Sequence, residues 1–82
     1  MINDKIHLIK IDVNGYEYEI IKCLKKQITK DLPLLVIENN KELKKISNYL
    51  EKFGYKKYYN SKGKLKKYTN QNVLDIFFII KK

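Results

Sequence analysis

The chain has 82 residues, of which 44% are hydrophobic, and a formal net charge of +9. A chain of this length forms one small domain, here residues 1–82, and buries roughly 60–65% of its unfolded surface. The hydrophobic content favours a folded chain over a disordered one. No apolar run reaches the ~18–20 residues of a membrane span and no signal-peptide pattern is present, so we predict a cytoplasmic protein.

The scarce reactive residues exclude several kinds of site. Cys23 is the single cysteine, so no internal disulfide is possible, and no Cys/His cluster offers a zinc site. We interpret Cys23 as a partly buried helix residue rather than a nucleophile. His7, the single histidine, is interpreted as a structural residue of a strand. The sequence therefore predicts no metal site.

The first two elements are a strand and a helix. Residues Lys5–Val13 are rich in β-branched side chains and predict a strand. Residues 16–30 predict one amphipathic helix whose apolar positions have helical spacing. Those positions are Ile20, Ile21, Leu24 and Ile28. After Pro33, residues Leu34–Ile37 are apolar at every position, which is typical of a parallel strand covered on both faces.

The second helix carries the clearest boundary signals. Asn39 is the expected N-cap, and Glu42 three residues later makes a variant of the capping box. Gly54 stands where a left-handed C-terminal cap is expected. The apolar stripe between them consists of Leu43, Ile46, Leu50 and Phe53.

The last part of the chain predicts two strands joined by a polar segment. Tyr55–Tyr59 reads as a short edge strand, because its two lysines would block unwanted pairing. Residues 60–72 are polar, with a turn at Gly63. Residues 73–80 are apolar on both faces, so this strand is expected in the interior of the sheet, antiparallel to the previous one.

The predicted order is therefore β-α-β-α-β-β, an open α/β sheet with two parallel strands and a C-terminal antiparallel hairpin. The last strand most simply lies between the second strand and Tyr55–Tyr59. This arrangement leaves the first strand with an uncovered edge. Such an edge can pair with its copy across a two-fold axis, so we predict a homo-oligomer.

Polar residues follow both parallel strands at their carboxyl ends, where open α/β sheets bind ligands. Asp12, Asn14 and Gly15 lie at the end of the first strand, and Glu38 and Asn39 lie at the end of the second. Because the strands are adjacent and parallel, we expect both groups at one rim of the sheet.

Lys10 is two residues before Asp12, so both side chains point to the same face of the first strand. The alternative reading of this pattern is a local ion pair combined with an Asp or Asn helix cap. The three glycines, Gly15, Gly54 and Gly63, make no G-x-G loop that would approach a nucleotide. The sequence thus provides half of a cleft and no cofactor cradle.

Several segments in order resemble one known family. "HLIKIDVNGYEYEIIK", "PLLVIEN" and "LKKISNYLEKFGYK" are similar to the second half of FkbM-like methyltransferases, in which "IKIDVEG-E" is a hallmark. The likeness runs from about Lys5 to Tyr59. The resemblance implies the C-terminal part of an S-adenosylmethionine-dependent O-methyltransferase of Rossmann-like fold, with these segments as its fourth to seventh strands and a sugar or other small hydroxyl compound as acceptor.

The resemblance also implies roles for individual residues. Asp12 would lie near the transferred methyl group, as base or as the group that orients the acceptor, with Lys10 beside it. Glu38 would line the same cleft. Asn14 stands where the family usually has Glu, and the donor-binding half is missing from the sequence. The resemblance therefore implies a fragment, inactive alone or completed by a second chain that supplies the N-terminal half.

A second hypothesis comes from the charge. The chain would be a small lysine-rich α/β module for binding or oligomerisation. Its contacts with an anionic partner would be made by Lys62, Lys64, Lys66 and Lys67. All 18 basic residues are lysine, and arginine provides the fork that recognises phosphate and guanine. The excess of lysine is interpreted as compositional bias rather than selection for a partner, and nucleic-acid binding is therefore not expected.

Overall fold

The fold is a five-stranded mixed sheet with three helices. The computed structural model describes residues 7–12 and 15–80. In chain order the elements are β1 (Leu8–Ile11), α1 (Glu17–Cys23), α2 (Lys25–Asp31), β2 (Leu34–Glu38), α3 (Leu43–Glu51), β3 (Tyr55–Ser61), β4 (Lys64–Lys67) and β5 (Asp75–Ile80). The strand order is β1-β2-β5-β3-β4, with β1 and β2 parallel and the other neighbours antiparallel. The predicted α/β class is confirmed.

The last strand lies inside the sheet, as its apolar pattern predicts. β5 pairs with β2 on one side and with β3 on the other. Ile76 and Phe78 are fully buried on one of its faces, opposite Ile37 and Leu35 of β2. A strand that is apolar on both faces is most stable in the interior of the sheet, where its side chains are buried and its backbone is paired on both sides.

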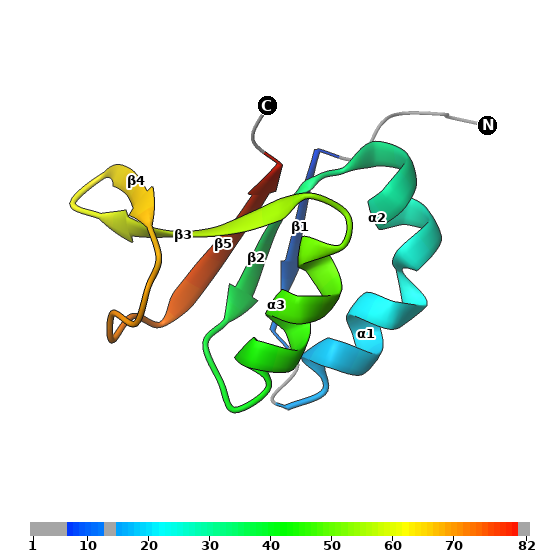
Figure 1. The fold of residues 1–82 in the computed structure, drawn as a ribbon, viewed down its shortest axis with the longest axis horizontal. Coiled ribbons are helices and arrows are strands. Elements are labelled where there is room, and N and C mark those ends of the chain that lie inside the picture. The colour runs from blue at the N-terminus through cyan, green and yellow to red at the C-terminus, as the bar shows by residue number, and fades with distance from the viewer. Residues whose placement is uncertain (1–6, 13–14, 81–82) are drawn as a thin grey trace.

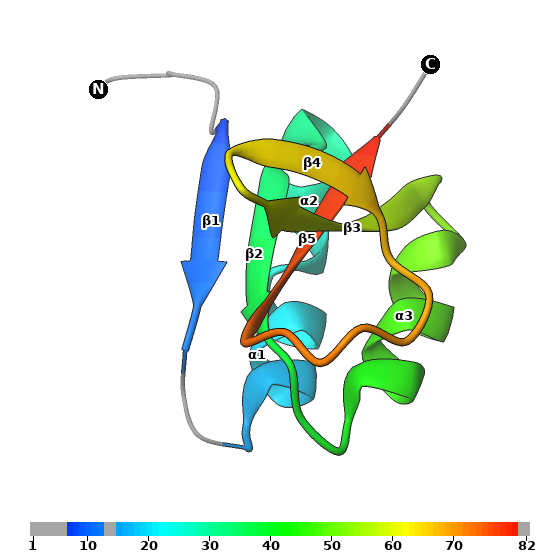
Figure 2. The same cartoon turned by 90° about the vertical axis from the view of Figure 1, so that its left-hand side faces the viewer.

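All three helices lie on the same side of the sheet (Figures 1 and 2). They cover a core of ten buried hydrophobic residues: Ile11, Ile21, Ile28, Leu35, Ile37, Ile46, Leu50, Tyr55, Ile76 and Phe78. The predicted stripe of α3 is confirmed, since Ile46 and Leu50 are buried and Leu43 and Phe53 pack against the core. None of the helices described is long and apolar enough to cross a membrane.

The opposite face of the sheet is not covered by a helix among the described residues. Along β2 the residues alternate, with Leu35 and Ile37 fully buried and Leu34 and Val36 half-buried. The prediction that this strand is covered on both faces is therefore wrong for this part of the chain. We call the uncovered side the bare face.

The predicted single helix over residues 16–30 is wrong, because the chain bends at Leu24. Its ψ of 12° leaves the helical range, and its N–H is shared between the carbonyls of Ile20 and Ile21. Ile21 and Ile28, which lie on either side of Leu24, are both in the core with no exposed surface. Ile20, expected in the apolar stripe, is 36% exposed.

Two smaller expectations about this region are also corrected. Cys23 ends α1 and is exposed rather than partly buried. β1 is shorter than predicted, starting at Leu8, and Lys5 and Val13 lie outside the described residues. His7 precedes β1, is exposed, and accepts the Leu34 N–H through its main-chain carbonyl at 2.9 Å.

The second helix begins later than the capping box predicts. Glu42 occupies the N-cap position of α3 without a side-chain capping hydrogen bond. The turn before it is made by Asn40, whose Oδ1 accepts the Glu42 N–H at 2.7 Å. Asn39, the predicted cap, is held elsewhere. The C-terminal expectation is confirmed, since Gly54 has a φ of +95°.

The polar segment 60–72 contains a strand that the sequence pattern does not predict. β4 pairs with β3 around a two-residue turn, Lys62-Gly63, with φ values of 51° and 86°. Such turns match the twist of a hairpin, and Asn60 accepts the Gly63 N–H at 2.9 Å. All four β4 residues are exposed, so main-chain pairing forms the strand without an apolar pattern. β4, not Tyr55–Tyr59, is the edge strand.

Candidate active site

The carboxyl ends of β1 and β2 meet at one rim of the sheet. The parallel register places Ile11 beside Ile37. The residues that come next, Asp12 after β1 and Glu38 at the end of β2, are therefore neighbours. Asp12 is exposed and Glu38 is half-buried.

A third carboxylate reaches this rim from the start of α1. Glu17 is fully buried. Its Oε1 accepts the Gly15 N–H and the Asn40 side-chain amide, each at 2.9 Å. Gly15 has a φ of +96°, which L side chains rarely adopt, and this turn aims its N–H at the carboxylate. Glu17 thus ties the β1–α1 turn to the loop after β2.

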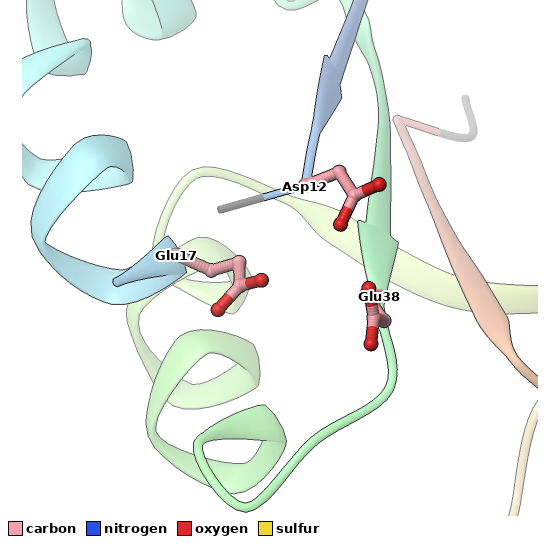
Figure 3. Close-up of side chains that lie close together, drawn as sticks. All are labelled: Asp12, Glu17 and Glu38. Atoms are coloured by element: carbon pink, nitrogen blue, oxygen red, sulfur yellow. The ribbon is translucent and has the colours of Figure 1, made fainter. Parts of the chain in front are cut away.

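Asp12, Glu17 and Glu38 form one acidic cluster, in which the carboxylate oxygens lie within 4.8 Å of one another (Figure 3). A hydrogen bond to the Asp12 carboxyl raises the pKa of Glu38, and the negative charge of Asp12 raises it further. Burial and the charges of Glu17 and Asp75 act in the same direction. The protonated form of Glu38 is thus favoured by a neighbouring carboxyl group, which makes a hydrogen bond with it and opposes its negative charge.

The acidic cluster has a composition that hard cations accept, since Mg²⁺ and Ca²⁺ prefer carboxylate oxygens. However, Glu17 Oε1 is already occupied by two N–H donors. The raised pKa of Glu38 also disfavours the ionised carboxylate that a cation would bind there. The absence of a metal site stays a prediction.

A cavity of about 340 Å³ opens at the same rim, lined by Gly15, Asn40, Lys41 and Glu42. Glu42 Oε2 lies 3.7 Å from Lys45 Nζ. Glu42 Oε1 is buried and has no hydrogen-bond partner among the described residues. A buried acceptor beside a cavity is suited to a ligand that brings an O–H or N–H donor.

The structure brings together only some of the residues predicted for this site. Asp12, Gly15 and Glu38 meet at the rim. Asn39 instead holds the loop before β5, donating its side-chain amide to the Val73 carbonyl at 3.0 Å. Asn14 lies outside the described residues.

Lys10 does not form the local ion pair with Asp12 that its spacing suggests. It lies on the bare face opposite Val36 and makes no ion pair with Asp12 within 4.0 Å. The side chain that Asp12 contacts is Glu38, a carboxyl group rather than an ammonium group.

Sequence reasoning missed Glu17 and gave Asn40 no separate role. Glu17 stands between Tyr16 and Tyr18 at the start of a helix, and a charged residue at that place is ordinarily exposed to solvent. The available signal was the glycine two residues earlier, because a turn with positive φ leaves an N–H that needs an acceptor.

Comparison with known proteins identifies a family for most of the chain. The model of the methyltransferase FkbM domain matches residues 2–57, which include all three carboxylates of the acidic cluster and end within β3. No curated protein and no solved structure gives a match. Because the match covers more than half of the 82 residues, the chain belongs to the FkbM methyltransferase family.

Proposed function

We propose that this chain provides the acceptor side of an S-adenosylmethionine-dependent O-methyltransferase site. The observation that carries the proposal is the pairing of Asp12 with Glu38 at a rim inside the family match. In this proposal β1, β2, β3 and β5 are the fourth to seventh strands of a Rossmann-like sheet. The acceptor is a sugar or another small molecule with a hydroxyl group.

The acidic pair is suited to hold a hydroxyl and to take its proton. A carboxylate of the pair accepts the hydroxyl hydrogen bond and orients the oxygen for attack. When the hydroxyl proton leaves, it moves to the Asp12–Glu38 pair, where a raised pKa makes Glu38 a stronger base than an ordinary glutamate. Glu42 Oε1, buried beside the cavity, accepts a second hydroxyl of a polyol acceptor.

S-adenosylmethionine supplies, when bound, a methyl group on a positively charged sulfur. The residues of this chain do not fit the nucleotide part of that donor. Gly15, Gly54 and Gly63 are far apart, and none belongs to a G-x-G loop that would let a backbone approach the donor. We therefore assign the donor cradle to another polypeptide segment, and the 82 residues alone are expected to be inactive.

The sheet offers a place for that segment. β1 pairs with β2 along one edge only, among the described strands. The bare face beside it carries Leu8, Leu34 and Val36. Parallel sheets are covered on both faces, so a donor-binding segment that adds a strand to β1 and packs on the bare face completes the fold.

The test is a fusion in which the donor-binding half of an active FkbM-family enzyme precedes this chain. Transfer of a labelled methyl group to that enzyme's acceptor is measured. The fusion is expected to be active, and Asp12→Asn together with Glu38→Gln is expected to lower kcat about 10²-fold or more. Glu19→Gln, on the exposed side of α1, is the matched control and leaves kcat unchanged.

Calorimetry of the isolated chain tests the missing cradle separately. No saturable binding of S-adenosylmethionine is expected. Tight binding would show that these residues hold the donor after all. A folded fusion that binds the donor and has the same kcat with and without the two carboxylates would refute the role of the acidic pair.

A further inference from the structure

The β3–β4 hairpin concentrates positive charge at one end of the molecule. Residues 55–68 contain six lysines and no acidic residue. The lysines are Lys56, Lys57, Lys62, Lys64, Lys66 and Lys67. Five of them are exposed, and none makes an ion pair within 4.0 Å with an acidic residue that the structure describes. The hairpin extends away from α1 and α2 (Figure 1).

A cavity of about 380 Å³ lies at the base of this hairpin. It is lined by Glu51, Gly54, Tyr55, Lys56, Lys57, Lys67 and Tyr68. Both β3 and β4 therefore contribute lysine side chains to the lining of this cavity. The Glu51 carboxylate accepts the Ser47 hydroxyl at 3.0 Å, which binds it to its own helix.

An aromatic ring and an ammonium group stand together in this cavity. Lys57 Nζ lies 5.8 Å from the centre of the Tyr68 ring. The Tyr68 N–H donates to the Lys57 carbonyl at 3.0 Å, so the main chain fixes the two residues side by side. Proteins that bind single-stranded nucleic acid combine an aromatic ring, on which a base stacks, with a positive charge that contacts a phosphate.

We propose that the hairpin and this cavity bind single-stranded nucleic acid without sequence preference, with one base on Tyr68 and the backbone along the lysines. The lack of arginine argues against specific base recognition, but point charges are sufficient for phosphate contacts. At about 380 Å³ the cavity is at the small end of the range of small-ligand pockets, which favours one nucleotide unit over several. The lysines of β4 and of the turn continue beyond it, which favours a strand over a free mononucleotide.

The hairpin lies largely outside the segment that defines the family, since the family match ends at residue 57. It is also separate from the acidic cluster. The proposal therefore does not depend on the methyltransferase function, and the two can fail independently.

The experiment is fluorescence anisotropy with a labelled single-stranded oligouridine at several salt concentrations. Affinity is expected to fall steeply with salt. A variant in which Lys64, Lys66 and Lys67 are all changed to Gln should show a shallower slope of log affinity against log salt concentration. The magnitude of this slope should fall by about two, because each lost phosphate contact contributes about 0.7. Tyr68→Leu, which keeps an apolar side chain against the core, should weaken binding about tenfold.

The matched control changes Lys25, Lys26 and Lys30 of α2 to Gln. These lysines are exposed and lie on an element remote from the hairpin, and the change removes the same charge. Affinity and salt slope should stay close to those of the unaltered chain. Far-UV circular dichroism of every variant shows whether the fold is retained.

Three results would overturn the proposal. Equal losses in the β4 and α2 variants would show that only net charge matters. Competition by uridine monophosphate as strong as that by the oligouridine would make the ligand a free nucleotide. Binding to phosphatidylserine vesicles without binding to oligouridine would make the hairpin a membrane-surface contact.

Discussion

The acidic cluster depends on how each carboxylate is held. Glu17 is fixed by two N–H donors and is buried, whereas Asp12 is exposed and shares a hydrogen bond with Glu38. Because the Asp12 carboxyl makes a hydrogen bond with Glu38 and opposes its negative charge, the pKa of Glu38 is raised. This has consequences for stability that can be measured.

We expect the free energy of unfolding to fall as pH rises from 4.5, the ordinary pKa of Glu38, toward neutrality. Because the pKa of Glu38 is raised in the folded state, the native protein binds more protons than the unfolded chain in this window, and the stabilisation is lost as the pH passes the folded pKa. Glu38→Gln should flatten this part of the profile. Urea unfolding followed by circular dichroism at a series of pH values measures it.

The control for this profile is Glu19→Gln, which removes an exposed carboxylate of α1. Its pH dependence should follow that of the unaltered chain. A Glu38→Gln profile with the same slope would contradict the raised pKa of Glu38.

Glu17→Ala is expected to lower the free energy of unfolding by about 1–3 kcal/mol, because the Gly15 N–H and the Asn40 amide lose their acceptor in a part-buried site. Glu19→Ala, two residues away and exposed, should change it by less than about 0.5 kcal/mol. Urea midpoints of the two variants measure the difference. Equal midpoints would show that Glu17 contributes no more than a surface residue.

At the scale of elements, one hydrogen bond joins β3 to the segment before β2. The Tyr55 hydroxyl donates to the Pro33 carbonyl at 2.6 Å, and the side chain is fully enclosed. Burial raises the pKa of Tyr55 to about 12, so the hydroxyl remains a donor in ordinary buffers. This contact joins the residue before β2 to the first residue of β3, although β5 lies between these two strands in the sheet.

Tyr55→Phe is expected to cost about 1–3 kcal/mol of unfolding free energy, since it leaves the buried Pro33 carbonyl without its donor. Tyr59→Phe, at a half-buried position of the same strand, is the matched control with an effect below about 0.5 kcal/mol. Thermal unfolding of the two variants tests this, and a Tyr55→Phe variant as stable as the control would contradict it.

At the scale of the whole molecule, the two charged regions lie on different elements. The acidic rim lies at the carboxyl ends of β1 and β2, and six of the 18 lysines lie on the β3–β4 hairpin. The open edge of β1 is a third surface. Leu8 of this strand is 57% exposed.

Without a donor-binding segment, the chain is expected to pair with its own copy along β1. Leu8→Lys should raise the dimer dissociation constant at least ~tenfold, about 1.4 kcal/mol, because a charge on an edge strand opposes pairing. Leu74→Lys is the control, at a position that is 73% exposed in the loop before β5. Light scattering over a concentration series measures both. A monomer at every concentration would contradict the prediction.

The sequence by itself determined the α/β class, the interior place of β5 and the family, because these depend on apolar periodicity and on short motifs. It also located Asp12 and Glu38 at one rim, since adjacent parallel strands end at the same edge. Tertiary structure alone decided what depends on main-chain pairing and side-chain reach. β4 forms from exposed lysines by pairing with β3, and Glu17 joins the site because a turn with positive φ and Asn40 supply its donors.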